Sequence, residues 1–162
     1  MLINFLTNTP FYVYWIFFSL LFVGISQLKT RSVGLRRALI VPIVLILLSI
    51  YGLTSDFGIT FFSTSIWIAG MISAVILNTM IKKKKEIIYF KETKTFMIAG
   101  SFIPLSMMML LFWVKYTVGA VTALELEILH NTSFIGIFSL LYGLFTGTYL
   151  LRFYVLAKKI KD

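Results

Sequence analysis

The strongest constraint in this sequence is a series of five apolar segments that divide the chain. They cover about residues 11–28, 38–53, 59–81, 102–121 and 133–156. A transmembrane helix needs about 20 predominantly apolar residues. Hydrophobic residues make up 59% of the chain and charged residues only 13%, whereas soluble domains have about 45–50% and 25%. We therefore predict an all-α membrane protein, a five-transmembrane-helix bundle in which residues 1–162 form a single polytopic membrane domain.

The connection between the third and fourth segments has the composition of strands. β-Branched and aromatic residues on both sides of Lys91–Lys94 favour extended structure over helix. The pattern predicts a small β-hairpin over about residues 87–98. Because an isolated two-stranded hairpin is marginally stable in water, we expect it to lean on the membrane surface or on the helix ends.

The basic residues alternate between the two sides of the predicted bundle. Of the 15 Lys and Arg residues, 14 fall in the first connection, the third connection and the C-terminal segment. Short cytoplasmic loops carry an excess of Lys and Arg. This distribution predicts an N-terminus outside, a C-terminus in the cytoplasm and a cytoplasmic hairpin, in a bacterial inner (cytoplasmic) membrane.

The net charge of +9 has a simpler explanation than nucleic-acid binding, because the cations are divided among short connections beside apolar spans. We expect no nucleic-acid partner and assign the bilayer as the partner. The run Lys82, Lys83, Lys84 and Lys85 is a candidate for contact with lipid headgroups, since each cation gains about 1 kcal/mol near an anionic surface. The run either only determines topology or recognises a specific lipid.

Lys115 is the one ionisable side chain well inside an apolar segment, and such residues are candidates for function. It either snorkels outward or forms a structural ion pair, or it takes part in binding a ligand or ion. Gly119 and Thr122 share its helical face, so we expect Lys115 to face other helices. The candidate counter-charges are Glu125, Glu127 and Asp56.

The outer connection before the fifth segment places Glu127 and His130 three residues apart, on one face of a helical turn. Such a pair is compatible with part of a metal site or a proton relay, but also with solvated charges in an interfacial connection. With no cysteine and a single histidine in the chain, no full set of metal ligands is visible. We expect no metal site.

Small residues recur at helical spacing in two segments. Ser139, Gly143 and Gly147 form one stripe, and Gly70 with Ala74 forms another. Stripes of this kind allow the backbones of two membrane helices to approach closely. They predict helix packing, either within the chain or in a homodimer.

Several fragments together carry a resemblance. They are Asn8-Thr9-Pro10, Gly24-x-x-Gln27, Leu48–Gly52, Gly100–Leu105, Phe112-x-x-Lys115-Tyr116-x-x-Gly119 and Tyr142-Gly143-x-x-x-Gly147. The chain resembles an uncharacterised family of small bacterial integral membrane proteins with a domain of unknown function and five predicted spans. The resemblance implies a bacterial inner-membrane location and supplies no catalytic residue.

Sequence signatures of catalysis and cofactor binding are missing, including phosphate-binding loops, the dinucleotide fingerprint and the zinc-protease and serine-hydrolase motifs. We predict no enzymatic activity and no cofactor. The first hypothesis is a non-enzymatic accessory or interaction subunit that binds a second copy or another membrane protein. The alternative is a small transporter or channel using Lys115 with Glu125 or Glu127.

Overall fold

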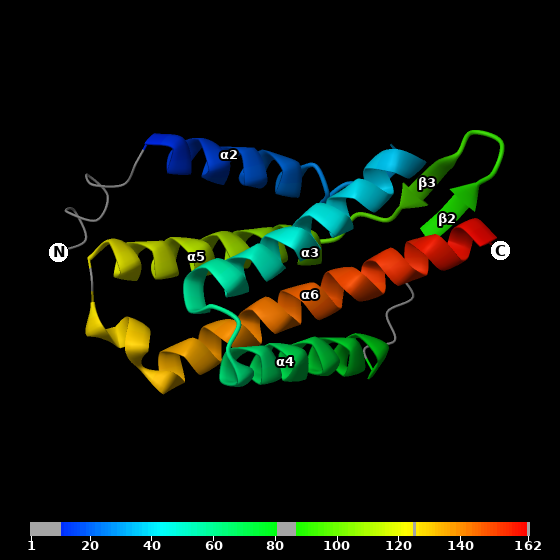
Figure 1. Cartoon of the computed structure of the whole chain (residues 1–162). Coiled ribbons are helices and arrows are strands. Elements are labelled where there is room, and N and C mark those ends of the chain that lie inside the picture. Colours follow the sequence, from blue (N-terminus) through cyan, green and yellow to red (C-terminus); the bar gives the residue numbers. More distant parts are fainter. Residues whose placement is uncertain (1–10, 81–86, 125, 162) are drawn as a thin grey trace.

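A computed structural model describes residues 11–80, 87–124 and 126–161, which form five α-helices, one short 3₁₀ turn and three strands (Figure 1). The helices are α2 (Phe11–Ile25), α3 (Leu35–Phe57), α4 (Phe61–Met80), α5 (Ile103–Ala123) and α6 (Thr132–Lys161), with the 3₁₀ turn η1 at Glu127–His130. The strands are β1 (Arg31–Gly34), β2 (Ile87–Phe90) and β3 (Thr95–Ile98). Lys82–Lys85 and Glu125, both singled out by the sequence, lie outside the described residues.

Four helices, α3 to α6, are long and apolar enough to cross a membrane. Helix α2 has 15 residues, or about 22 Å at 1.5 Å per residue, which is short of a hydrocarbon core of about 30 Å. The apolar run predicted as a span to residue 28 leaves the helix after Ile25 and turns towards β1. The described residues thus contain five helices at the predicted places, of which four have the length of a span.

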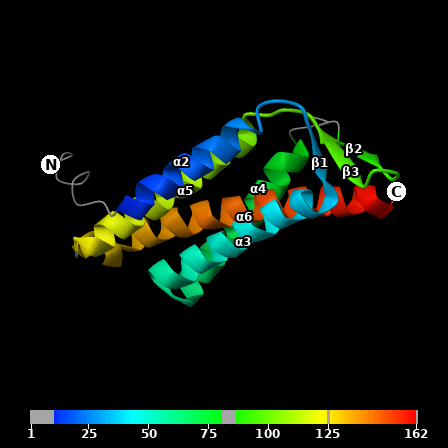
Figure 2. The ribbon, with the colours of Figure 1, turned by 90° about the horizontal axis from the view of Figure 1, so that it is seen from above.

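Helix α6 is the longest and lies at the centre of the bundle. Helices α3 and α4 pack along it, whereas α2 packs on α5 and the α2–α5 pair forms a second layer (Figures 1 and 2). Successive helices alternate in direction, so the sheet and the C-terminus share one end of the molecule and the turns α3–α4 and α5–η1–α6 point to the other.

The two small-residue stripes lie against one another inside the chain. A Cβ atom added at Gly143 would collide with the backbone carbonyl of Trp67, and one added at Gly70 would lie 2.5 Å from the carbonyl oxygen of Leu140. Gly147 likewise faces the backbone of α4 and the side chain of Ala74. The stripes therefore let α4 and α6 approach to backbone contact.

The sheet has one strand more than the hairpin predicted over residues 87–98. β2 and β3 form the expected antiparallel pair, and β1 adds to the other edge of β3, giving the order β1-β3-β2. Phe96 on β3 is fully buried and packs with Ala38 of α3 and Leu156 of α6. The third strand and this small core give the hairpin the support that two strands alone lack.

Candidate functional site: an ion pair between three helices

Lys115 forms an ion pair with Asp56. Its Nζ lies 2.8 Å from Oδ1 and 3.0 Å from Oδ2 of the carboxylate. Asp56 is the penultimate residue of α3, and Lys115 lies 12 residues into α5. The Asp56 side chain is 11% exposed and the Lys115 side chain 37% exposed. The pair thus joins the α2–α5 layer to the layer that contains α3.

Tyr142 of α6 completes the cluster. Its hydroxyl group donates a hydrogen bond of 2.7 Å to Oδ2 of Asp56, and the residue has no exposed surface. Lys115 Nζ also lies 5.7 Å from the centre of the Tyr51 ring and 6.0 Å from that of Tyr142, within the range of cation–π attraction. Asp56 accepts from both Lys115 and Tyr142, so three helices meet at one carboxylate.

Buried hydroxyl groups extend this cluster along the contact between α3 and α6. The Ser49 hydroxyl donates to the backbone carbonyl of Tyr142 at 2.7 Å. The hydroxyl oxygen of Thr146 lies 3.0 Å from that carbonyl oxygen and 3.0 Å from the Ser49 hydroxyl oxygen. These groups are shielded from solvent and satisfy one another, as buried polar groups must. The polar line fixes the rotation of α6 relative to α3 and so places Tyr142 at Asp56.

The charges of the cluster compensate each other, because one ammonium group faces one carboxylate. The hydrogen bonds of Asp56 come from Lys115 and Tyr142 of the same chain. Breaking such a pair leaves a charge without a partner in an apolar region, which is costly. The arrangement can hold α5 against α3 and α6. The Lys115 side chain keeps 37% of its exposed surface.

Of the counter-charges considered from the sequence, the structure brings Asp56 to Lys115. Glu127 lies in η1, beyond the end of α5, and is exposed. Lys115 is two helical turns before that end, and the end of α3, whose last turn contains Asp56, is set back towards the middle of α6 (Figure 1). The transport hypothesis therefore takes Asp56 in the place given to Glu127, while Glu125 lies outside the described residues.

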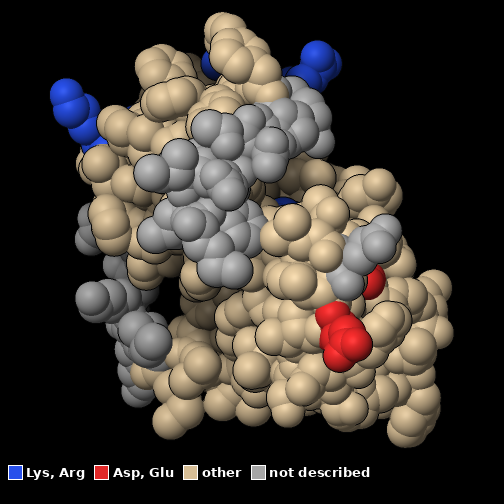
Figure 3. All heavy atoms as spheres, turned by 90° about the vertical axis from the view of Figure 1, so that its left-hand side faces the viewer, with Lys and Arg blue, Asp and Glu red and all other residues tan. Residues whose placement is uncertain are grey.

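His130 is exposed beside Glu127 at the end onto which Figure 3 looks, where acidic side chains reach the surface. Within residues 11–80, 87–124 and 126–161, no three His, Cys, Asp or Glu side chains come together in a way that would hold a metal ion. Among the described residues, the pair is exposed and has no third ligand beside it.

Sequence reasoning missed Tyr142, Ser49 and Thr146. Ser49 and Asp56 are seven residues apart and Tyr142 and Thr146 four apart, so each pair shares a helical face, and this spacing was the available signal. Lys115 faces α3 and α6 as its shared face with Thr122 predicted. Gly119, in contrast, borders open space.

The chain belongs to a family of unknown function (DUF6622), whose profile matches residues 1–162. This membership confirms the resemblance to an uncharacterised family. Comparisons with curated proteins and with solved structures give no match.

Proposed function

We propose that this member of the family is a non-enzymatic, multi-pass protein of the bacterial inner membrane that acts as an accessory subunit. In this proposal the N-terminus is outside, the C-terminus and the sheet are cytoplasmic, and α2 crosses the membrane as a fifth span. The partner is a transmembrane helix of another membrane protein, which docks on α2.

The observation that carries the proposal is an aromatic stripe on α2. Phe11, Trp15, Phe18 and Phe22 are 76%, 66%, 60% and 78% exposed. Their spacing of four, three and four residues places them on one face, as in the seam of a helix pair. We call these four residues the α2 stripe.

The opposite face of α2 is the one that packs in the chain. Gly24 lies against Leu105, and the rings of Phe17 and Phe112 are 5.1 Å apart. Helix α2 has α5 as its principal neighbour, so the α2 stripe is uncovered by the described part of the chain. A helix shorter than the bilayer gains from association with other helices, which favours a protein partner over lipid alone.

In-membrane photo-crosslinking tests this proposal. A photoreactive phenylalanine analogue at Phe18 is compared with the same analogue at Ile72, a 52% exposed position on α4. We expect Phe18 to give a discrete crosslinked protein and Ile72 to give lipid adducts. A crosslink to a second copy of the chain would replace the hetero-partner by a homodimer, and adducts to lipid alone at both positions would refute an accessory role for α2.

The ion pair favours a second candidate, a small transporter or channel in which Lys115 exchanges Asp56 for a passing anion. The support is a lysine that is paired yet 37% exposed among apolar helices. Purified protein in proteoliposomes tests this candidate by anion flux above that of empty vesicles. The flux should disappear in Lys115→Met and persist in Lys159→Met, which removes an exposed lysine at the end of α6.

A further inference from the structure

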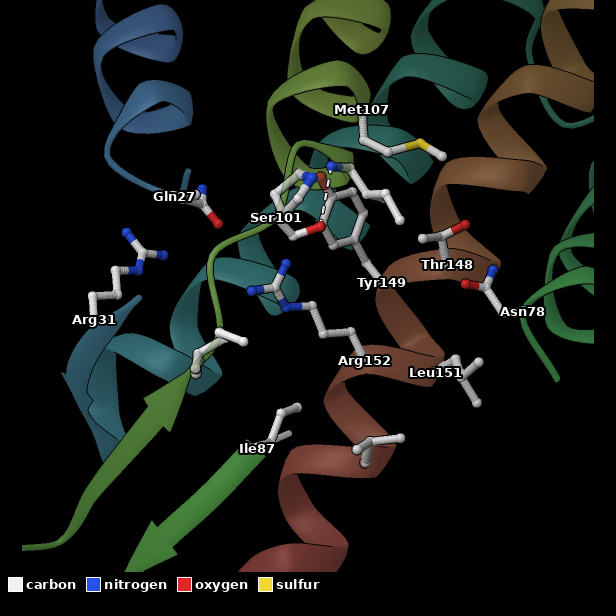
Figure 4. A pocket seen from close by; sticks show the side chains of 15 residues that line it. Gln27, Arg31, Asn78, Ile87, Ser101, Met107, Thr148, Tyr149, Leu151 and Arg152 are labelled. Atoms are coloured by element: carbon white, nitrogen blue, oxygen red, sulfur yellow. Dashed lines mark hydrogen bonds between the residues drawn. The ribbon is translucent and has the colours of Figure 1, made fainter. Parts of the chain in front are cut away.

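The end of the molecule opposite the ion pair contains two adjoining cavities of about 340 and 410 Å³ that share Gln27, Arg31, Ile98 and Arg152. They lie where the connection after α2, the sheet, the first half of α3, the start of α5 and α6 meet. Figure 4 shows the side chains of Arg31 and Arg152 directed into this region from β1 and α6, with Gln27 beside them. We call it the arginine cavity.

Arg31 and Arg152 line both cavities, so their two positive charges face the same space and repel each other. Partial burial lowers the pKa of Arg31, yet guanidinium stays charged in proteins. The ion pair found among the described residues is that of Lys115 with Asp56, at the other end of the bundle. No described carboxylate therefore neutralises Arg31 or Arg152, although charges removed from water need a counter-charge.

Two buried polar side chains at the same cavity have unused hydrogen-bonding groups. Tyr149 is 2% exposed, and its hydroxyl group has no partner within the described chain. Gln27 is 4% exposed, with an unpartnered Oε1, while its Nε2 makes a 3.6 Å contact to the sulfur of Met108. Both side chains line the arginine cavity, and their unpartnered atoms have almost no exposed surface.

The donor set matches a phosphate group. Arginine forms two parallel hydrogen bonds to phosphate oxygens, and two arginines balance its double or single negative charge. Arg31 donates one N–H to the Ser26 hydroxyl at 3.1 Å, and its other N–H groups are available for a ligand. A metal cation is excluded as the occupant by the two positive charges that face the cavity.

The remaining lining is mostly apolar. Its polar members are Asn78, Ser101 and Thr148 in one cavity and Ser32 and Arg37 in the other. Met107, Leu151 and Val155 line the cavity of about 340 Å³ on the side of α5 and α6, and this volume is within the range of small-molecule sites. A ligand with a polar head between the arginines and an apolar part along these side chains would match both the charged and the apolar lining. We propose that the arginine cavity binds a phosphate-bearing anion, supplied either as the headgroup of an anionic phospholipid or as a soluble phosphate.

Backbone contacts fix the wall of the cavity that contains Gln27. The amide of Ser101 donates to the carbonyl of Gln27 at 3.0 Å, and Gly100 lies against the backbone of Leu28, where a Cβ would collide. These contacts tie the end of α2 to the segment before α5. Gln27 is thus placed before any ligand arrives, which lowers the entropy lost on binding.

Thermal unfolding of purified, delipidated full-length protein in phosphate-free buffer tests the proposal. The probes are phosphatidylglycerol in mixed micelles, diacylglycerol with the same acyl chains, and inorganic phosphate. Stabilisation by phosphatidylglycerol but by neither of the others identifies a lipid headgroup as the source. Stabilisation by inorganic phosphate as well identifies a site for soluble phosphate.

Variants show whether the effect belongs to the arginine cavity. Arg31→Gln and Arg152→Gln should each weaken binding of the stabilising probe at least tenfold. Arg36→Gln removes the same charge from an exposed position outside both cavities and should leave binding within twofold of the parent. If Arg152→Gln does not fold, Arg31→Gln and Tyr149→Phe carry the test.

The proposal is wrong if no probe stabilises the parent, or if Arg36→Gln weakens binding as much as Arg31→Gln does. A further variant, Glu86→Gln, removes a carboxylate next to β2 in the sequence. The proposal is also wrong if this variant destabilises the probe-free protein as much as Arg152→Gln does and the probes have no effect. In that case the chain itself supplies the counter-charge. The accessory role of α2 does not depend on either outcome.

Discussion

Lys115 and Asp56, 59 residues apart in the sequence, form an ion pair of 2.8 Å between α5 and the last turn of α3. Tyr142 binds the same carboxylate from α6. One acidic side chain thereby connects three helices, and α5 has few other contacts with α3. The pair is the principal polar connection between the two layers of the bundle.

Removal of the Lys115 charge should destabilise the protein. Lys115→Met keeps the bulk of the side chain but leaves Asp56 with the Tyr142 hydroxyl alone. Breaking a fully buried pair costs about 3–5 kcal/mol; because Lys115 is 37% exposed, we expect about 1–3 kcal/mol, since solvent screens part of the interaction. Thermal unfolding in detergent measures the effect.

Lys159→Met is the matched control, since it deletes an exposed lysine, and its melting temperature should stay near that of the parent. The double variant Lys115→Met with Asp56→Leu should recover part of the loss, because no charge is then left unpaired. A melting temperature of Lys115→Met clearly above that of the parent would contradict the paired arrangement.

Two tyrosines of α6 should respond differently to loss of the hydroxyl group. Tyr142→Phe removes a charge-assisted hydrogen bond of 2.7 Å to Asp56 and should cost about 1.5–3 kcal/mol. Tyr149→Phe removes a buried hydroxyl that has no partner among the described residues, so in delipidated detergent it should be neutral or stabilising. Equal losses in unfolding free energy for the two variants would argue against this assignment.

The helices were predictable because long apolar runs leave the chain few alternatives in a membrane. The third strand was not, because Ser32 and Gly34 are weak strand formers and β1 pairs with β3 more than 60 residues later. Pairing of Ser32 with Met97 depends on where α2 ends relative to α5. That position is set by tertiary contacts such as the hydrogen bond from Ser101 to Gln27.

The candidate site was predictable in its charges and not in its geometry. A lysine inside an apolar segment is easily recognised in the sequence, and Asp56 was among the three candidate partners of Lys115. The choice between Asp56 and Glu127 depends on how far the α3–α4 turn reaches along α6, which no local pattern encodes. Tyr142 was not predicted as a site residue, because a tyrosine in an apolar helix is equally compatible with packing.

Membrane orientation can be tested because the chain contains no cysteine. Glu92→Cys lies in the turn between β2 and β3, Glu127→Cys lies in η1, and both positions are exposed. With the sheet in the cytoplasm, a membrane-impermeant maleimide added to intact cells should label Cys at position 127 and leave position 92 unlabelled until the cells are opened. The opposite pattern would invert the proposed topology.

Phe96 should be the most sensitive position of the sheet. It is fully buried, and its ring lies 4.8 Å from that of Tyr89. Phe96→Ala should cost about 3–5 kcal/mol, as large-to-small changes in cores do. Met97→Ala, at a 42% exposed neighbour on the other face of β3, should cost much less. Limited proteolysis of the 87–98 region measures the difference, and equal cleavage of the two variants would show that the sheet does not depend on this core.

The contact between α4 and α6 should tolerate a methyl group at one glycine of α6 and reject it at another. Gly143→Ala pushes a methyl group into the backbone of Trp67, where neither helix can yield without moving apart, and overpacking of this kind costs about 1–3 kcal/mol. Gly136→Ala meets the ends of the Ile66 and Phe62 side chains at 3.5 Å or more, which is ordinary contact. Because alanine is a better helix former than glycine by about 0.5–1 kcal/mol, Gly136→Ala should raise the melting temperature in detergent while Gly143→Ala lowers it. A gain in both variants would mean that α4 and α6 do not approach to backbone contact.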